Sequence, residues 1–185
     1  MRLLLVLGSL LLTASYYSSL QNWAEKEEAA ISYEEPEAYK VYSAVVPKDS
    51  LWREAKTLVI QIETRGNELC IQPDEEVERF IGSAIADYER VNQKKWALRS
   101  DIDIAKPYSL IHYDEIYNIL KEPNGWKTFF QHHPDTGGYI VLSAVGFNPD
   151  KTVAVMSMTH ADGLMALEEG SMCLRKPTTN GTVWC

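Results

Sequence analysis

The feature that most constrains the fold is a pair of apolar segments separated by a short polar turn. Residues 139–147 and 152–159 are rich in Val, Ala and Met, and the sequence between them, residues 148–151, is Asn-Pro-Asp-Lys. Proline fixes one backbone dihedral of such a turn, while Asn and Asp side chains bond to nearby backbone. The pattern predicts a β-hairpin. Because both faces of its strands are largely apolar, we expect it to lie centrally in a sheet that is covered on at least one side.

A second strong pattern is an amphipathic segment over residues 74–93. Its apolar residues recur every three or four positions, the repeat of one face of an α-helix. They are Val77, Phe80, Ile81, Ala84, Ile85, Tyr88 and Val91. Asp74 can cap the first turn of this helix. We expect the first five residues of the stripe to be buried against the hairpin, around Leu142, Val153 and Val155.

Shorter elements complete the expected fold. A helix is predicted over 35–46, ended by Pro47, a short helix from Asp114 to the break at 122–125, and a helical turn or two from Trp126 to Pro134. Strands are predicted over 57–64, 108–112, 171–176 and 182–185, the third of these after a loop over 160–170. The sequence therefore predicts an α+β fold in which a mostly antiparallel sheet, with a C-terminal β-meander, packs against one long and several short helices.

The N-terminal segment predicts export. Arg2 precedes an apolar run over residues 3–12 and Thr-Ala-Ser at 13–15, which is the layout of a secretory signal peptide. The run is about half the length of a membrane-spanning helix, which needs roughly 20 apolar residues. We expect residues 1–15 to be a signal peptide cleaved after Ser15, and the alternative is an uncleaved anchor. The sequence thus predicts a periplasmic or secreted protein.

The remaining chain divides into a linker and one domain. Residues 16–34 are acidic and offer little that could fill a core, which is typical of a linker. Residues 35–185 are long enough to bury a core and are expected to form a single α+β domain. The net charge of −8 disfavours nucleic acid and anionic membrane surfaces as partners. Membrane contact is expected only through the N-terminal segment, if it stays uncleaved.

The three cysteines, Cys70, Cys173 and Cys185, are too few and too scattered for a zinc cluster. After export one pair could form a disulfide, and the sequence does not select the pair. The alternative is that all three are small apolar residues in strands.

One group of possible metal ligands lies at the end of a predicted helix. His132 and His133 are adjacent and Asp135 is close by, and these residue types bind transition metals. Adjacent residues on a helix, however, point about 100° apart, and no HExxH or HxH spacing is present. The sequence therefore predicts no metal and no cofactor, and a polar helix end explains these residues.

The predicted loop over 160–170 is the other place where chemistry could lie. It carries His160, Asp162, Glu168 and Glu169, and binding residues often lie on loops held by a rigid scaffold. His160, Asp162 and Glu168 are the candidate catalytic residues for acid–base chemistry. No GxSxG nucleophile motif accompanies them. The alternative is an ordinary solvated connection.

The hairpin also resembles a known group of proteins. Residues 138–154 are similar to the core of uncharacterised exported bacterial proteins, G-Y-I-x-L-S-x-V-G-F-N-x-D-x-T-x-A, and residues 58–64 and 126–134 look similar as well. The resemblance implies export and an α+β fold, and it supplies no activity. Members of the group carry a cysteine-containing loop after the hairpin, whereas this chain has no cysteine over 160–165. A cysteine-based role for this loop is therefore not carried over.

Two functional hypotheses follow. The first is a non-enzymatic exported domain that binds a small molecule or a protein partner in the cell envelope or outside the cell. The second is a small exported hydrolase with a His/Asp/Glu site around residues 160–170. Convergence of His160, Asp162, Glu168, His132 and His133 in one pocket would favour the second hypothesis.

Overall fold

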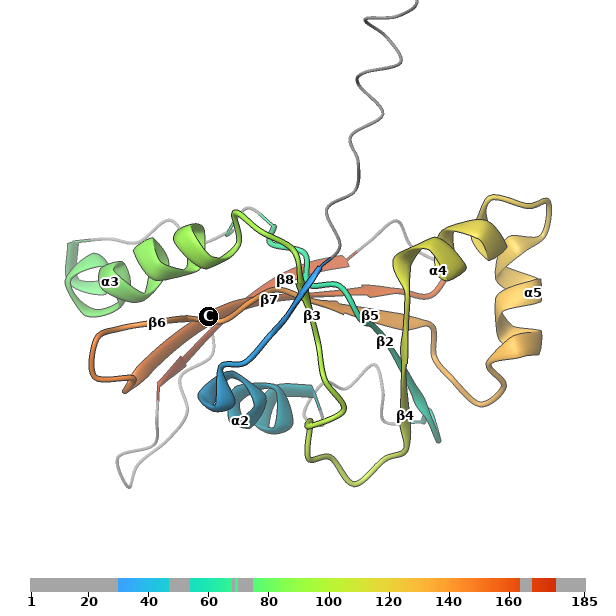
Figure 1. Ribbon diagram of the computed structural model, residues 1–185, viewed down its shortest axis with the longest axis horizontal. Helices are drawn as coiled ribbons and strands as arrows, with labels where there is room; N and C mark the ends of the chain where they lie inside the picture. Colours follow the sequence, from blue (N-terminus) through green and yellow to red (C-terminus); the bar gives the residue numbers. More distant parts are fainter. Residues whose placement is uncertain (1–29, 47–53, 68, 70–74, 164–167, 176–185) are drawn as a thin grey trace, which may run out of the picture.

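The computed structural model describes residues 30–46, 54–67, 69, 75–163 and 168–175. These residues form a mixed β-sheet with helices on both faces (Figure 1). The elements in chain order are β1 (Ile31–Ser32), α2 (Pro36–Val45), β2 (Leu58–Gln61), α3 (Glu75–Val91), β3 (Trp96–Ala97), β4 (Tyr108–Ile111), α4 (Tyr113–Leu120), α5 (Gly125–His132), β5 (Tyr139–Leu142), β6 (Gly146–Phe147), β7 (Val153–Ala161) and β8 (Glu168–Arg175). The predicted α+β class is confirmed.

The main sheet has an antiparallel half and a parallel half. Its strand order is β4-β2-β5-β7-β6, with β8 paired to β7. The pairs β5–β7, β6–β7 and β7–β8 are antiparallel, and this half contains the predicted hairpin. The pairs β2–β4 and β2–β5 are parallel, which the sequence patterns do not predict. Parallel neighbours need long crossover connections. Here β2 is connected to β4 through α3 and β3, and to β5 through the longer chain that also includes β4, α4 and α5.

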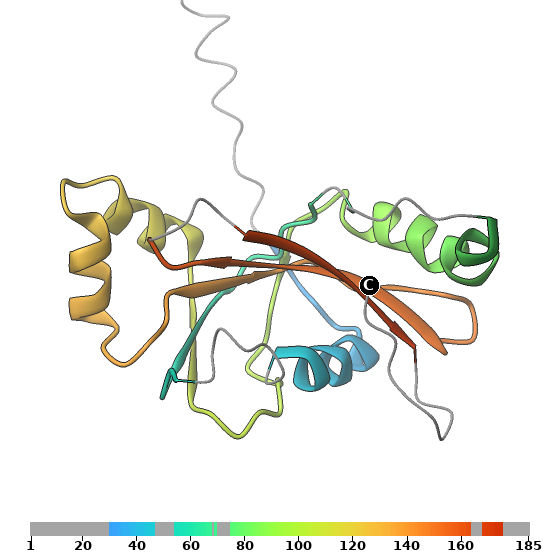
Figure 2. The same cartoon turned by 180° about the vertical axis from the view of Figure 1, so that it is seen from behind.

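Strand alternation sends neighbouring side chains to opposite faces of this sheet. Leu58 and Ile60 of β2 pack in a core with Tyr42 of α2, whereas Val59 packs with Phe129 of α5. Two views of the ribbon show α2 on one side of the sheet, α3 and α4 on the other, and α5 upright beside one end of the sheet (Figure 1, Figure 2). The buried pattern of β2 therefore reflects burial on both faces.

The long helix α3 packs against the hairpin as predicted, but over a narrower area. Ile81 and Ala84 lie in one buried cluster with Val153 and Val155. Two expectations are wrong. Phe80 is 45% exposed, and Leu142 lies in the α2 cluster on the opposite face. Helix α3 contacts β6 and β7 at one end of the sheet, so these strands cover only part of its apolar stripe.

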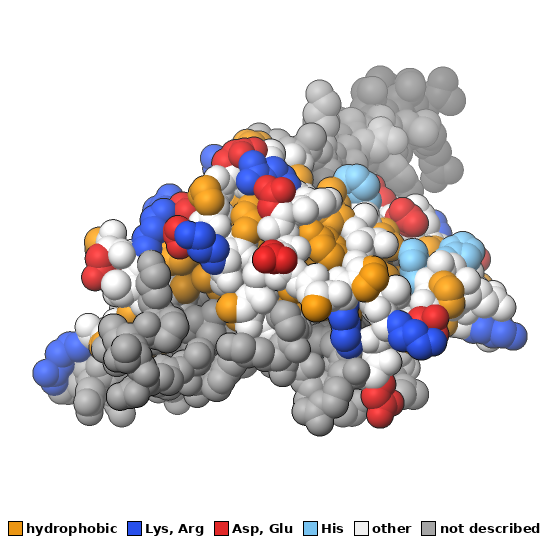
Figure 3. Space-filling model, turned by 90° about the horizontal axis from the view of Figure 1, so that it is seen from below, with side chains coloured by type: hydrophobic (Ala, Val, Ile, Leu, Met, Phe, Trp, Pro, Cys, Tyr) orange, Lys and Arg blue, Asp and Glu red, His pale blue; other side chains and the backbone are white. Residues whose placement is uncertain are grey.

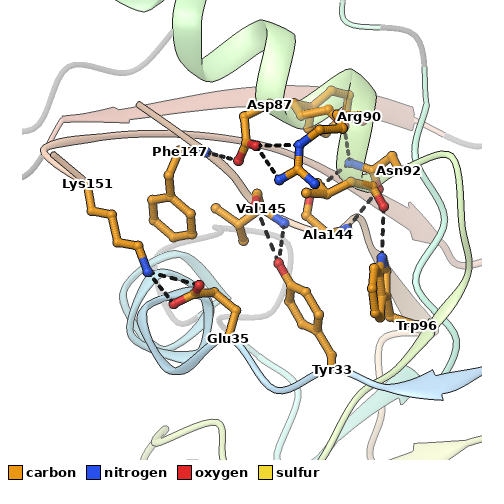
Figure 4. A network of polar contacts seen from close by, with 12 residues as sticks. Tyr33, Glu35, Asp87, Arg90, Asn92, Trp96, Ala144, Val145, Phe147 and Lys151 are labelled. Carbon is orange, nitrogen blue, oxygen red and sulfur yellow. Dashed lines mark hydrogen bonds and ion pairs between the residues drawn. The ribbon is translucent and has the colours of Figure 1, made fainter. Parts of the chain in front are cut away.

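The predicted strand over 139–147 is interrupted between β5 and β6. Here side chains take over the backbone hydrogen bonds that a ladder would supply. Asn92 binds both backbone groups of Ala144, at 2.9 Å to the amide and 3.0 Å to the carbonyl. Tyr33 does the same for Val145 (Figure 4). The backbone groups of Ala144 and Val145 at this break therefore have the hydrogen-bond partners that buried backbone groups need.

The close approach of α3 to β6 depends on Gly146. A Cβ atom at this position would lie 2.2 Å from the Tyr88 backbone nitrogen and 2.5 Å from the Ala84 carbonyl oxygen. Beside it, the Asp87 carboxylate accepts a hydrogen bond of 2.9 Å from the Phe147 amide (Figure 4). Strand β6 and helix α3 are thus joined by direct backbone contact and by a polar anchor.

Among the boundaries that differ from those predicted, three concern the linker and the predicted loop over 160–170. Strand β1 pairs with β3, and Tyr33 is buried, so the folded body begins before the predicted linker end at residue 34. Strand β7 extends to Ala161 and β8 begins at Glu168, so the connection is shorter than predicted. These strands extend further because their backbones pair in register from Val153–Arg175 to His160–Glu168.

Several predictions fall outside the described residues. They concern residues 1–15, Cys70, Cys185 and the strand over 182–185. Within the described part of the chain, no helix has the length and hydropathy needed to cross a membrane.

Candidate functional site

His160 lies in strand β7 and not in a loop, which corrects its expected placement. It is largely buried, and its Nε2 lies 2.9 Å from the Gly137 carbonyl oxygen. A carbonyl oxygen only accepts, so Nε2 must carry the proton. That nitrogen is therefore a donor bound to the backbone and does not serve as a general base in this arrangement.

The other candidate catalytic residues follow β7 or start β8. Asp162 is the residue after β7 and is half-buried. Glu168 begins β8, where its backbone stands opposite His160 in the antiparallel register. The side chain of Glu168 lies outside what the structure describes.

The possible metal ligands of α5 have other environments. The His132 and His133 rings are 6.4 Å apart with their planes at 74°, and the ring of His133 lies 4.8 Å from that of Phe129. Burial lowers the pKa of His133, and its Nε2 has no hydrogen-bond partner among the residues that the structure describes. The Asp135 carboxylate forms an ion pair of 3.2 Å with Lys56. Across the described residues, no group of three or more His, Cys, Asp or Glu side chains is arranged to hold a metal ion.

The histidines of the two candidate groups do not meet. By strand alternation His160 shares the face of Met156 and Met158, which belong to the α2 cluster. His132 and His133 lie at the end of α5, which packs on the opposite face. No described contact therefore favours the hydrolase hypothesis.

A groove between α2 and the segment after β3 is the candidate functional site. Its volume is about 550 Å³, and it is lined by Pro36, Tyr39, Lys40, Ser43, Ala44, Arg99, Asp101 and Asp103. The two ribbon views show α2 beside the chain that follows β3 (Figure 1, Figure 2). Ser43 joins these walls, because its hydroxyl accepts a 2.8 Å hydrogen bond from the Asp103 amide and donates one of 2.6 Å to the Tyr39 carbonyl.

Tyr39 and Arg99 hold the other end of the groove. The Tyr39 hydroxyl accepts a hydrogen bond of 2.9 Å from the Arg99 amide and donates one of 3.0 Å to the Tyr33 carbonyl. The Arg99 guanidinium lies 5.3 Å from the centre of the Tyr39 ring, within cation–π range. Burial, the largest influence, raises the pKa of Tyr39, so its hydroxyl stays protonated at neutral pH. These contacts fix the shape of the wall before any ligand arrives.

Charged side chains surround the groove in pairs. Lys40 binds Glu37 at 2.6 Å, and Arg99 binds both Asp101, at 2.6 Å, and Glu34. On the side of the molecule where α2 lies, acidic and basic side chains alternate around apolar ones (Figure 3). No cation among the described residues pairs with Asp103, the last carboxylate of the groove.

Sequence reasoning missed a second polar feature, the pair formed by Glu63 and His112. Glu63 Oε1 lies 2.7 Å from His112 Nδ1, and Oε2 accepts a 2.9 Å hydrogen bond from the Tyr113 amide. Both residues follow the carboxyl ends of the adjacent parallel strands β2 and β4. Glu63 therefore caps α4, since His112 at the N-cap makes no capping bond of its own.

The groove residues were also missed, because they come from segments 60 residues apart. The one available signal was the polar outer face of the predicted helix over 35–46, which a solvated helix shows as well.

Comparisons with known proteins find no relative of this chain: no protein-family model matches the chain, and neither the curated proteins nor the solved structures include a significant match. The resemblance of the hairpin to exported bacterial proteins therefore stays a prediction.

Proposed function

We propose that this chain is an exported, non-enzymatic domain that binds a small molecule or a short segment of a partner in the groove between α2 and residues 99–103. The groove volume lies in the range of known ligand sites, about 300–1,000 Å³. Its lining combines apolar surface from Pro36, Tyr39 and Ala44 with four charged side chains and Ser43, so it is more polar than the mostly apolar lining of a typical ligand site.

The observation that carries the proposal is the rigid construction of the groove. The Ser43 hydroxyl ties Asp103 to α2, and the Tyr39 hydroxyl ties Arg99 to the segment before α2. Binding at a site that is already ordered loses less conformational entropy than binding at a mobile one. The ordered groove therefore supports the binding hypothesis. The hydrolase hypothesis has less support, because its candidate histidines lie apart.

A ligand titration followed by amide NMR tests the binding proposal. We expect added ligands to shift the amides of Lys40, Ser43 and Ala44 and to leave those of α3 unchanged. Ala44→Trp should block the groove and abolish these shifts. Ala86→Trp, which places the same side chain at an exposed position of α3, should preserve them. Equal effects of the two variants would contradict the proposal.

Export rests on the N-terminal sequence. We expect a bacterial host to process the full-length chain to a form that begins at Tyr16 and lies outside the cytoplasm. Val6→Glu should stop this processing, because it puts a charge into the apolar run. Ser19→Glu, which adds the same charge beyond that run, should not. Fractionation with N-terminal sequencing measures both outcomes, and an unprocessed wild-type chain in the cytoplasm would contradict export.

A further inference from the structure

We infer that the groove between α2 and residues 99–103 takes an organic cation, an amine or guanidinium group on a short apolar stem. This inference rests on the proposed binding function and names the ligand class of that site.

The first argument is the charge balance of the groove. Two of the lining residues are cations, Lys40 and Arg99, and two are carboxylates, Asp101 and Asp103. Glu37 and Glu34 add two further carboxylates by pairing with these cations. Among these six described residues, four carboxylates against two cations leave a surplus of two negative charges, so the potential that they produce favours a positive ligand.

The second argument concerns which charges remain available. Lys40 and Arg99 both have carboxylate partners at hydrogen-bond distance. An anionic ligand would have to displace one of these partners. A cationic ligand meets no such competition at Asp103, which has no cationic partner among the described residues. The Asp101 carboxylate, which is 52% exposed, can also accept a second donor.

The third argument concerns the stem of the ligand. Pro36, Ala44 and the ring of Tyr39 contribute apolar surface to the groove. Alkyl stems of amines lie along such surface while the charged group stays near water and carboxylates. The Asp103 position is fixed independently of its carboxylate, because the Ser43 hydroxyl holds its backbone amide. The groove lining therefore contains both the anchoring carboxylate and the apolar surface for a stem.

Three compounds with the same five-carbon stem test the sign of the preferred charge. They are 1,5-diaminopentane, 1,5-pentanediol and glutarate. Each is titrated into the protein that is purified after expression of the full-length sequence. We expect the diamine to bind most tightly, judged from the amide shifts of Ser43 and Ala44. Its affinity should fall with added salt, since exposed ion pairs are screened.

A matched pair of charge reversals tests the location. Asp103→Lys should weaken diamine binding by about fivefold or more, because an exposed pair is lost and a repulsion is added. The same variant should bind glutarate more tightly than the wild type does. Asp114→Lys changes the net charge equally at an exposed position of α4 and should leave diamine affinity within about twofold. Asp103→Asn, the milder change, should fall between the wild type and Asp103→Lys.

The possible failures are distinguishable. Tighter binding of glutarate or pentanediol to the wild-type groove would overturn the cation inference and leave the binding function standing. Equal losses in Asp103→Lys and Asp114→Lys would show that net charge alone attracts the diamine, which also overturns it. If the groove amides respond to none of the three compounds and to none of the ligands added in the binding titration, the proposed function and the inference are both contradicted. The amide spectrum of each variant reports whether it is folded.

Discussion

The hydroxyl of Tyr33 forms a two-way hydrogen bond with the backbone of Val145, 112 residues later in the chain. It accepts from the Val145 amide at 3.0 Å and donates to the Val145 carbonyl at 3.4 Å. Both residues are buried, and burial raises the pKa of the Tyr33 phenol well above its ordinary value. One side chain thus joins the segment before α2 to the interruption between β5 and β6 (Figure 4).

Removal of this hydroxyl is expected to destabilise the fold. Tyr33→Phe leaves a buried amide and a buried carbonyl of Val145 without partners, which costs about 1–3 kcal/mol. Tyr113→Phe removes a hydroxyl from an exposed ring and should change the free energy of unfolding by less than about 0.5 kcal/mol. Urea denaturation measures both values. Similar stabilities for the two variants would show that the Tyr33 bonds contribute nothing beyond packing.

The contact between β6 and α3 is expected to tolerate no added atom. Gly146→Ala brings a Cβ within 2.2 Å of the Tyr88 backbone nitrogen, so α3 must move away from the sheet. Overpacking of this kind costs about 1–3 kcal/mol, or more where the neighbour is backbone. Ser83→Ala, at an exposed position of α3, should change stability little. Thermal unfolding of both variants checks this, and an unchanged melting temperature for Gly146→Ala would contradict the close approach.

The stability of the α5 end is expected to fall in mild acid because of His133. Burial, and secondarily the nearby His132, lower its pKa, while Glu115 acts in the opposite direction. As the pH falls, residue 133 of the unfolded chain therefore takes up a proton before His133 of the folded protein does. The stabilisation contributed by neutral His133 is complete above the ordinary histidine pKa, and it is lost as the pH falls through the pKa of His133 in the folded protein.

A variant series assigns this pH dependence. The loss of unfolding free energy between pH 7.5 and 5 should be smaller in His133→Gln than in the wild type. His132→Gln, which removes only a lesser influence on the pKa of His133 and changes an exposed ring on the same helix, should retain most of the wild-type loss. Denaturant titrations at several pH values measure it, and parallel curves for all three proteins would exclude His133 as the source.

Glu63 is expected to stabilise α4 through its cap more than through its histidine. Glu63→Ala removes the acceptor of the Tyr113 amide at the positive end of the helix and should cost about 1 kcal/mol. His112→Ala removes a hydrogen-bond partner of the same carboxylate whose side chain is 70% exposed, and should cost less, because polar pairs at exposed positions contribute about 0–1 kcal/mol. Equilibrium unfolding of the two variants gives the order. The reverse order would mean that Glu63 stabilises the start of α4 mainly through the His112 imidazole and not through the cap.

Local sequence patterns determined the elements and the fold class. The repeat of apolar residues located α3, and the apolar segments around the Asn-Pro-Asp-Lys turn located the β5–β6–β7 hairpin. Such patterns work because each helical turn and each strand residue presents its side chain in a fixed direction relative to its neighbours. They do not say which strands pair in parallel, nor where a strand such as β7 ends, because strand pairing depends on distant residues.

Only the tertiary structure decided the surroundings of the candidate residues. It placed His160 within a strand, left Phe80 exposed beyond the area that β6 and β7 cover, and joined Ser43 to Asp103 across the groove. None of these follows from local periodicity, which reports the direction of a side chain but not what covers it. Burial and charge pairing arise when segments far apart in the chain meet, so the groove exists only in the folded protein.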